Sequence, residues 1–302
     1  MNTLRFLLLG LSLLLVGAPV ADAAPKKATV GVFLPTTLTD GQERFQFAEA
    51  LAARLGEVLE RPVAAKSFGR YEDFARAVSD GIVDFAVVDA WAAAQLGARV
   101  SPVAFAPLSG ETRQRWAIIS SSKKTVKELA GKRLALVKGA GSVDPRFISN
   151  VVLAGDLDAR KHFKLVPVPN VESALKMLEA KGAEAALVPL AHVPEGMSVL
   201  YRSSKVPGAV LVGVRGGAEE LQARLSRFTP VAPFGAFVPV QGKEMEDFRR
   251  LLLRGPPRRQ PQLVSSPTLR VDAEALVDTR VLQPVLPSFV DALEVSAEQP
   301  DD

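Results

Sequence analysis

Short apolar strands alternate with amphipathic helices along the first third of the chain. Residues 28–34 form an apolar run typical of a buried strand, and apolar residues recur every three or four positions over 45–58, which indicates a helix. Further strands are expected over 63–67 and 83–88, on either side of a second helix whose apolar face begins at Tyr71. This β-α-β-α-β order predicts an open, mostly parallel sheet.

The same pattern returns about 100 positions later. Strands are expected over 133–137, 164–168 and 185–188. Moved by 100 positions, the apolar helix face of the first block coincides with that of the second: Tyr71, Phe74, Ala75 and Val78 fall on Val171, Ala174, Leu175 and Leu178. An internal repeat of this kind predicts two similar α/β lobes.

The segments after the second block determine the expected domain organisation. A strand over 209–214 and helices over 219–228 and 243–253 follow a lobe that is already complete, so we expect them to return to the first lobe. The prediction is a two-lobe α/β clamshell of open, mostly parallel sheets joined by a two-segment hinge. Its parts are a discontinuous lobe I (24–108 and 206–295), lobe II (109–205) and a loose acidic tail (296–302).

The first residues have the pattern of an export signal. Arg5 precedes an apolar run over 6–16, and the small-residue triplet Ala21-Asp22-Ala23 follows, so we expect a signal peptide over 1–23. The apolar run is too short for a membrane anchor. With 0 cysteines, the chain offers no lipid-modified cysteine, no cysteine nucleophile and no thiolate metal site. A periplasmic, unanchored protein is expected.

Composition excludes several other functions. The net charge of +4 is spread thinly, without the concentrated basic stripe of a nucleic-acid-binding protein. The chain has no phosphate loop ending in Gly-Lys-Ser/Thr, no His-Glu-x-x-His pair and no Gly-x-Ser-x-Gly elbow. We therefore expect no nucleic-acid partner, no metal, no cofactor and no enzymatic activity. An enzyme would have to rely on Asp89, Asp144 and His192.

Candidate ligand-binding residues follow the predicted strands, because ligands of open α/β sheets bind at the carboxyl ends of the strands. Glycines in one of these loops would allow close approach of the backbone to an anion. The candidates are Thr36, Thr37, Asp89, Trp91, Gly139, Gly141, Ser142 and His192.

Two stretches resemble a known family. One runs from Arg113-x-x-Trp116 to the block Leu129-Ala130-Gly131-Lys132-Arg133, and the other covers Tyr71 to Ala86. Both are similar to type 2 periplasmic solute-binding proteins, in particular the phosphate/phosphite/phosphonate-binding branch. The likeness extends over about 29–214. It implies a cleft between two lobes, a small-molecule ligand, a permease of an ABC importer as partner, and a monomer.

One loop departs from the family pattern. The stretch 139–145 carries a single hydroxyl, where phosphonate binders have several, and adds Asp144, expected at a helix N-cap. A carboxylate there would repel a phosphonate. Two ligand classes therefore remain open. One is a phosphonate or other oxyanion, and the other is a neutral, zwitterionic or cationic solute that Asp89 and Trp91 would bind. A ligand sensor or partner-binding scaffold of the same fold, uncoupled from transport, is the alternative function.

Overall fold

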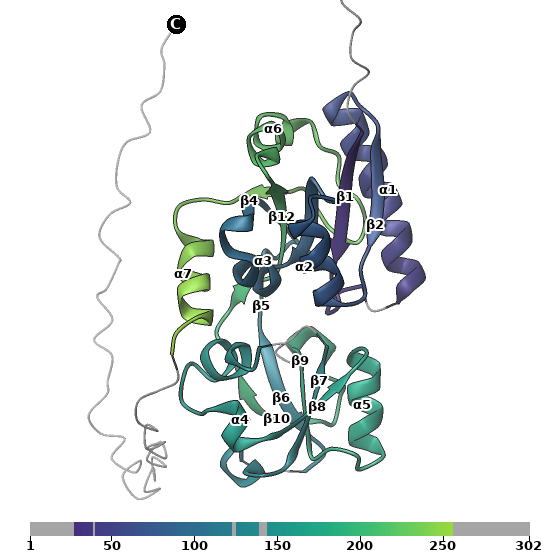
Figure 1. The fold of residues 1–302 in the computed structure, drawn as a ribbon. Coiled ribbons are helices and arrows are strands. Elements are labelled where there is room, and N and C mark those ends of the chain that lie inside the picture. The colour runs from purple at the N-terminus through teal and green to yellow at the C-terminus, as the bar shows by residue number, and fades with distance from the viewer. Residues whose placement is uncertain (1–26, 39, 123–124, 139–143, 256–302) are drawn as a thin grey trace, which may run out of the picture. The chain divides into compact units, whose positions relative to one another are not determined.

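The computed structural model describes residues 27–38, 40–122, 125–138 and 144–255 (Figure 1). The expected signal peptide, the glycine-containing loop 139–143 and everything after 255 lie outside the described residues. No helix in these described ranges is long and apolar enough to cross a membrane.

One mixed sheet of six strands includes both the first and the last strand of the described chain. Its order is β13-β4-β12-β3-β1-β2, with β1 parallel to β2 and β3 and with β12 antiparallel to β3 and β4. The strands are β1 (Ala28–Phe33), β2 (Val63–Ser67), β3 (Phe85–Asp89), β4 (Val100–Ala106), β12 (Ala209–Val214) and β13 (Val238–Pro239). Its helices are α1 (Gly41–Leu59), α2 (Tyr71–Ser79), α3 (Ala90–Leu96) and α6 (Gly217–Arg224).

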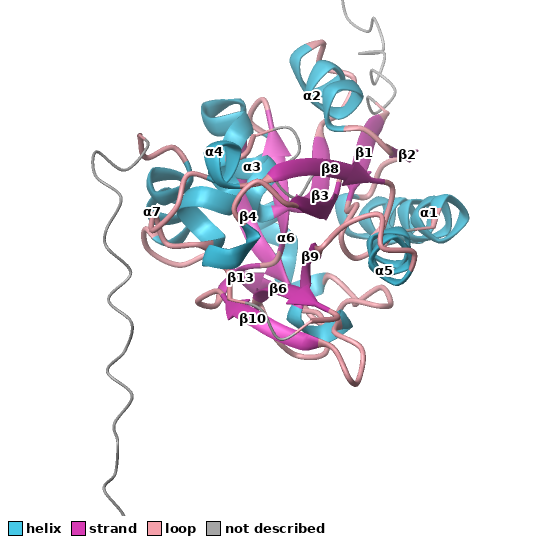
Figure 2. Ribbon diagram, turned by 90° about the horizontal axis from the view of Figure 1, so that it is seen from below, coloured by secondary structure: helices cyan, strands magenta, loops and turns pink. Residues whose placement is uncertain are grey.

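Helix α1 shows how the sequence pattern produces this packing. The carboxylate of Asp40 accepts hydrogen bonds from the backbone N–H of Gln42 at 2.8 Å and of Glu43 at 3.0 Å, so it caps the helix. The apolar face that carries Leu51 and Leu55 is buried in the core of this sheet. Figures 1 and 2 show α1 running along β1 and β2, against which it packs.

A second mixed sheet has five strands in the order β10-β6-β9-β7-β8. Strand β7 is parallel to β8 and β9, and β6 is antiparallel to β9 and β10. The strands are β6 (Trp116–Ser120), β7 (Arg133–Val137), β8 (Lys164–Val168), β9 (Ala185–Pro189) and β10 (Ser198–Arg202). Its helices are α4 (Ala159–His162) and α5 (Val171–Glu179), with a single π-helical segment over Phe147–Val152.

Two chain segments connect the sheets and pair with each other. Strands β5 (Arg113–Gln114) and β11 (Val206–Pro207) form a two-stranded antiparallel ladder. The chain passes through β5 from β4 to β6, and through β11 from β10 to β12.

The internal repeat is visible in the structure. Helices α2 and α5 begin at Tyr71 and Val171, and strands β3 and β9 begin at Phe85 and Ala185. The parallel cores β2-β1-β3 and β8-β7-β9 have the same strand order. The predicted α/β fold is confirmed, although each sheet is more mixed than expected, because β12 and β6 enter antiparallel.

The later helices differ in their bounds from the expectation. Helix α6 begins two residues before the predicted 219–228 and ends at Arg224, where a 3₁₀ turn over Leu225–Arg227 follows. Helix α7 (Glu244–Leu252) agrees with the predicted 243–253 within one residue at each end. It packs against α3 and against Phe147–Val152.

Candidate functional site

A pocket of about 480 Å³ lies beside the two connecting segments. It takes its wall from the loop after β1, from both connecting segments and from the turn after β9. The lining residues are Thr36, Thr37, Ala106, Leu108, Ser109, Glu111, Arg113, Gln114, Arg115, Pro189, Leu190, Ala191, His192, Lys205, Gly208, Ala209 and Phe234. A volume of this size suits a small-molecule ligand.

The charged side chains of the wall are mostly basic. Arg113 forms an ion pair with Glu244 at 2.7 Å, and Lys205 forms one with Glu111 at 2.9 Å. Arg115 donates to the backbone carbonyl of Ser203 at 2.9 Å and forms no ion pair with any carboxylate of the described chain. The uncompensated charge of Arg115 makes the pocket suited to an anion.

The hydroxyl of Thr36 connects the pocket wall to a buried carboxyl. It donates a hydrogen bond to Oδ2 of Asp89 at 2.9 Å, and the two residues are 1% and 2% exposed. Asp89 ends β3, where its backbone pairs with Ala209 of β12, and it does not line the pocket itself. Asp89 therefore acts on the pocket only through Thr36.

Burial raises the pKa of Asp89 to about 7, against the lowering effect of the hydrogen bond from Thr36 and of the nearby N–H of Trp91. The second carboxylate oxygen, Oδ1, has no hydrogen-bond partner in the part of the chain that is described, and neither has Nε1 of Trp91. A carboxyl with so few donors holds a proton for about half of the time near pH 7.

An aromatic cluster includes Trp91, the residue whose N–H lies near this carboxyl. The ring of Phe33 lies 6.0 Å from those of Tyr71 and Trp91 and 5.6 Å from that of Phe74. Tyr71 and Trp91 are 5.3 Å apart. The cluster joins β1, α2 and α3 at the end of the sheet where Asp89 lies. Burial raises the pKa of Tyr71 as well.

The structure brings together three of the predicted site residues. Thr36, Thr37 and His192 line the same pocket. Asp89 and Trp91 are buried and do not line it, so neither is placed for direct contact with a ligand there. Gly139, Gly141 and Ser142 lie outside the described residues.

The basic residues of the pocket are not among the ligand-binding residues predicted from the sequence. Arg113, Arg115 and Lys205 belong to the connecting segments, which the search for residues after strands passed over. Basic residues close to the predicted boundaries between the two lobes would have been the signal for all three.

Asp144 is less repulsive to anions than the sequence suggested. Its Oδ1 accepts a hydrogen bond from the backbone N–H of Arg146 at 3.0 Å, just before the helical segment that begins at Phe147, and its carboxylate is paired with the Arg146 guanidinium. Burial raises its pKa, but hydrogen bonds from the side chain and backbone of Arg146 lower it by more. Its negative charge is thus largely compensated within the loop.

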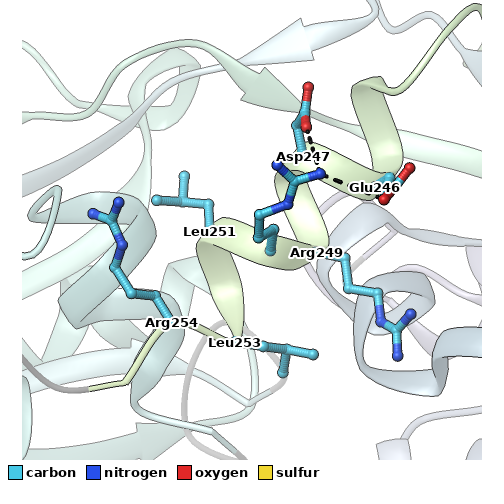
Figure 3. A pocket seen from close by; sticks show the side chains of 7 residues that line it. Glu246, Asp247, Arg249, Leu251, Leu253 and Arg254 are labelled. Atoms are coloured by element: carbon cyan, nitrogen blue, oxygen red, sulfur yellow. Dashed lines mark hydrogen bonds and ion pairs between the residues drawn. The ribbon is translucent and has the colours of Figure 1, made fainter.

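A second pocket, of about 670 Å³, lies along helix α7 (Figure 3). Its described lining comes from α7 and the two residues that follow it, between Glu246 and Arg254. Arg250 forms ion pairs there with Glu246 at 3.4 Å and Asp247 at 3.3 Å. Because a single helix supplies these residues and pairs its own charges, this groove lacks the convergent polar groups of a ligand site.

Comparison with known proteins gives one family match. The model of the family described as "ABC transporter, phosphonate, periplasmic substrate-binding protein" matches residues 34–229, which is more than half of the 302 residues. No curated protein matches the chain.

Solved structures share the fold at low sequence identity. XAC2383 from Xanthomonas citri, bound to chloride ion, has a TM-score of 0.59 and 15% identity, over 75% of this chain and 97% of its own. A binding protein component of an ABC phosphonate transporter from Pseudomonas aeruginosa has a TM-score of 0.58 and 16% identity, over 74% and 85%. PhnD1 from Prochlorococcus marinus, in complex with methylphosphonate, has a TM-score of 0.55 and 12% identity, over 75% and 97%.

Proposed function

Because the chain belongs to the family of phosphonate periplasmic substrate-binding proteins of ABC transporters, we propose that its pocket binds a small oxyanion and delivers it to an ABC importer. The proposal that the ligand is an anion rests on the excess of basic side chains that line the pocket. Arg113, Arg115 and Lys205 face one lining carboxylate, that of Glu111. A phosphonate or sulfonate is the ligand class that this arrangement fits.

The ion pairs in the wall leave its cations available. The side chains of Lys205 and Glu111 are 47% and 62% exposed. An exposed ion pair of this kind contributes only about 0–1 kcal/mol to stability. An anion that offers several oxygens can therefore replace Glu111 as the partner of Lys205. Arg115 needs no such exchange. Thr37 adds a hydroxyl from the loop after β1.

The remaining parts of the proposal concern the whole chain. The two predicted lobes correspond in this proposal to the six-stranded and the five-stranded sheet, with the β5–β11 ladder as the hinge. Gly139, Gly141 and Ser142 lie outside the described residues and remain candidates for binding the same ligand. The signal peptide over 1–23 exports the protein, which acts as an unanchored monomer and catalyses no reaction.

Arg115→Gln is expected to weaken binding of methylphosphonate by about tenfold or more, because a hydrogen bond to a charged group contributes about 1.5–3 kcal/mol. Isothermal titration at pH 7 measures the dissociation constant. Arg115→Lys should keep part of the affinity, since it keeps the charge.

The matched control is Arg54→Gln, which removes an exposed arginine that pairs with Glu57 on α1 and does not line the pocket. Equal affinities for Arg115→Gln and the wild type would mean that the anion binds elsewhere. Tighter binding of arginine than of methylphosphonate or methanesulfonate would reverse the assignment of ligand charge.

A further inference from the structure

The carboxyl of Asp89 is buried one hydrogen bond away from the anion pocket. Thr36 lines that pocket, and its hydroxyl donates to Oδ2 of Asp89 at 2.9 Å. Oδ1 of Asp89 and Nε1 of Trp91 are both buried and lack hydrogen-bond partners within the described ranges. An ionised carboxyl is thus poorly satisfied at this position.

Few polar groups face Asp89 from the surrounding elements. Thr36 faces it from the loop after β1 and Trp91 from α3, and these two residues and burial account for its shifted pKa. No charged side chain among the described residues contributes to that shift. The titratable groups nearest along the pocket wall are those of the lining itself, namely Glu111, Arg113, Arg115, His192 and Lys205.

The hydroxyl of Thr36 has a single hydrogen to donate. While Asp89 is ionised, this hydrogen is used by the carboxylate. When Asp89 is protonated, its own O–H donates to the oxygen of Thr36, and the threonine hydrogen becomes free for another acceptor. An anion in the pocket is such an acceptor, and its negative charge also disfavours an ionised carboxyl nearby.

We propose that Asp89 is a positioning residue that couples anion binding to proton uptake: the carboxyl takes a proton from solvent when the anion enters, and Thr36 then donates its hydrogen to the ligand. This inference rests on the proposed function, because it requires an anion in the pocket. One proton is bound at Asp89 and none is exchanged with the ligand. Binding therefore becomes weaker as the pH rises and Asp89 ionises.

The test is isothermal titration of methylphosphonate into the wild type and Asp89→Asn. At pH 7, titrations in two buffers of different ionisation enthalpy should show that the wild type takes up about half a proton more than the variant. Proton exchange at any other group occurs in both proteins and cancels in this difference. The ratio of the dissociation constants, wild type over Asp89→Asn, should rise from about 1 at pH 5.5 to about tenfold or more at pH 8.5.

Threonine variants separate this coupling from a purely structural effect. Thr36→Val removes the hydroxyl with little change in shape, and it should weaken binding and abolish the extra proton uptake. Thr36→Ser should retain both, since it keeps the hydroxyl. If circular dichroism shows that Asp89→Asn does not fold, the two Thr36 variants still test the coupling.

The outcomes distinguish this inference from the proposed function. If the wild type binds methylphosphonate with the same proton uptake and pH profile as Asp89→Asn and Thr36→Val, the coupling is wrong and the anion site stands. If the wild type binds no methylphosphonate at any pH, both the proposed function and the coupling are wrong.

Discussion

Asp89→Asn should make the unliganded protein more stable at pH 8. The folded protein holds the carboxyl at a pKa of about 7 instead of its ordinary 3.8, because the site is buried. A shift of this size corresponds to about 4 kcal/mol of unfolding free energy that is lost when the carboxyl has to ionise in place. Asparagine avoids that loss, and its amide can face both the N–H of Trp91 and the oxygen of Thr36, as the protonated acid does.

The sign of the pH dependence follows from the raised pKa. Between pH 3.8 and about 7 the folded state binds more protons than the unfolded state, so the wild type loses stability as the pH rises through this window. Asparagine does not titrate. The advantage of the variant should therefore grow by about 2–3 kcal/mol between pH 5 and pH 8, with most of the change below pH 7.

Urea unfolding of both proteins at pH 5, 6, 7 and 8 measures this difference. Asp80→Asn provides the matched control, because it makes the same change at a carboxyl that is exposed rather than buried. A constant difference between Asp89→Asn and the wild type over this range would show that Asp89 is already ionised in the folded protein at low pH.

Phe33→Ala should destabilise the protein by about 3–5 kcal/mol, the range found for truncating a fully buried phenylalanine. Phe33 is 1% exposed and lies at the centre of the aromatic cluster that joins β1 to α2 and α3. Its loss leaves a cavity among Tyr71, Phe74 and Trp91. Thermal and urea unfolding at pH 6 measure the effect.

Two further substitutions make this result specific. Phe45→Ala removes the same side chain where it is 50% exposed, and it should change stability by less than about 1 kcal/mol. Phe33→Leu should cost less than Phe33→Ala, because it fills part of the cavity. Equal effects of Phe33→Ala and Phe45→Ala would mean that the cluster contributes little to the fold.

Local patterns in the sequence predict the repeated parts of the fold well. Strand β7 and the apolar face of α5 are specified by contiguous residues and by helical spacing, so their position needs no knowledge of the rest of the chain. Strands β4, β6 and β10 were not assigned, since they enter the sheets through antiparallel partners distant in sequence. The ladder between Gln114 and Val206 is likewise a long-range pairing.

The candidate site was predictable only where it follows a strand. Thr36, Thr37 and His192 follow β1 and β9, and the structure places them on one pocket. Arg115 and Lys205 reach that pocket because their two segments pair with each other, which no local pattern reveals. The sequence predicts direct contact of Asp89 with the ligand, whereas in the structure its side chain is buried and hydrogen-bonded to Thr36.

The central claim is that an oxyanion binds in the pocket beside the β5–β11 ladder. A crystal structure of the protein grown with methylphosphonate tests it most directly. We expect the phosphonate oxygens within hydrogen-bond distance of the Arg115 guanidinium and the Thr36 or Thr37 hydroxyl. A fully occupied ligand bound away from these side chains, or a pocket that stays free of ligand at saturating methylphosphonate, would contradict the claim.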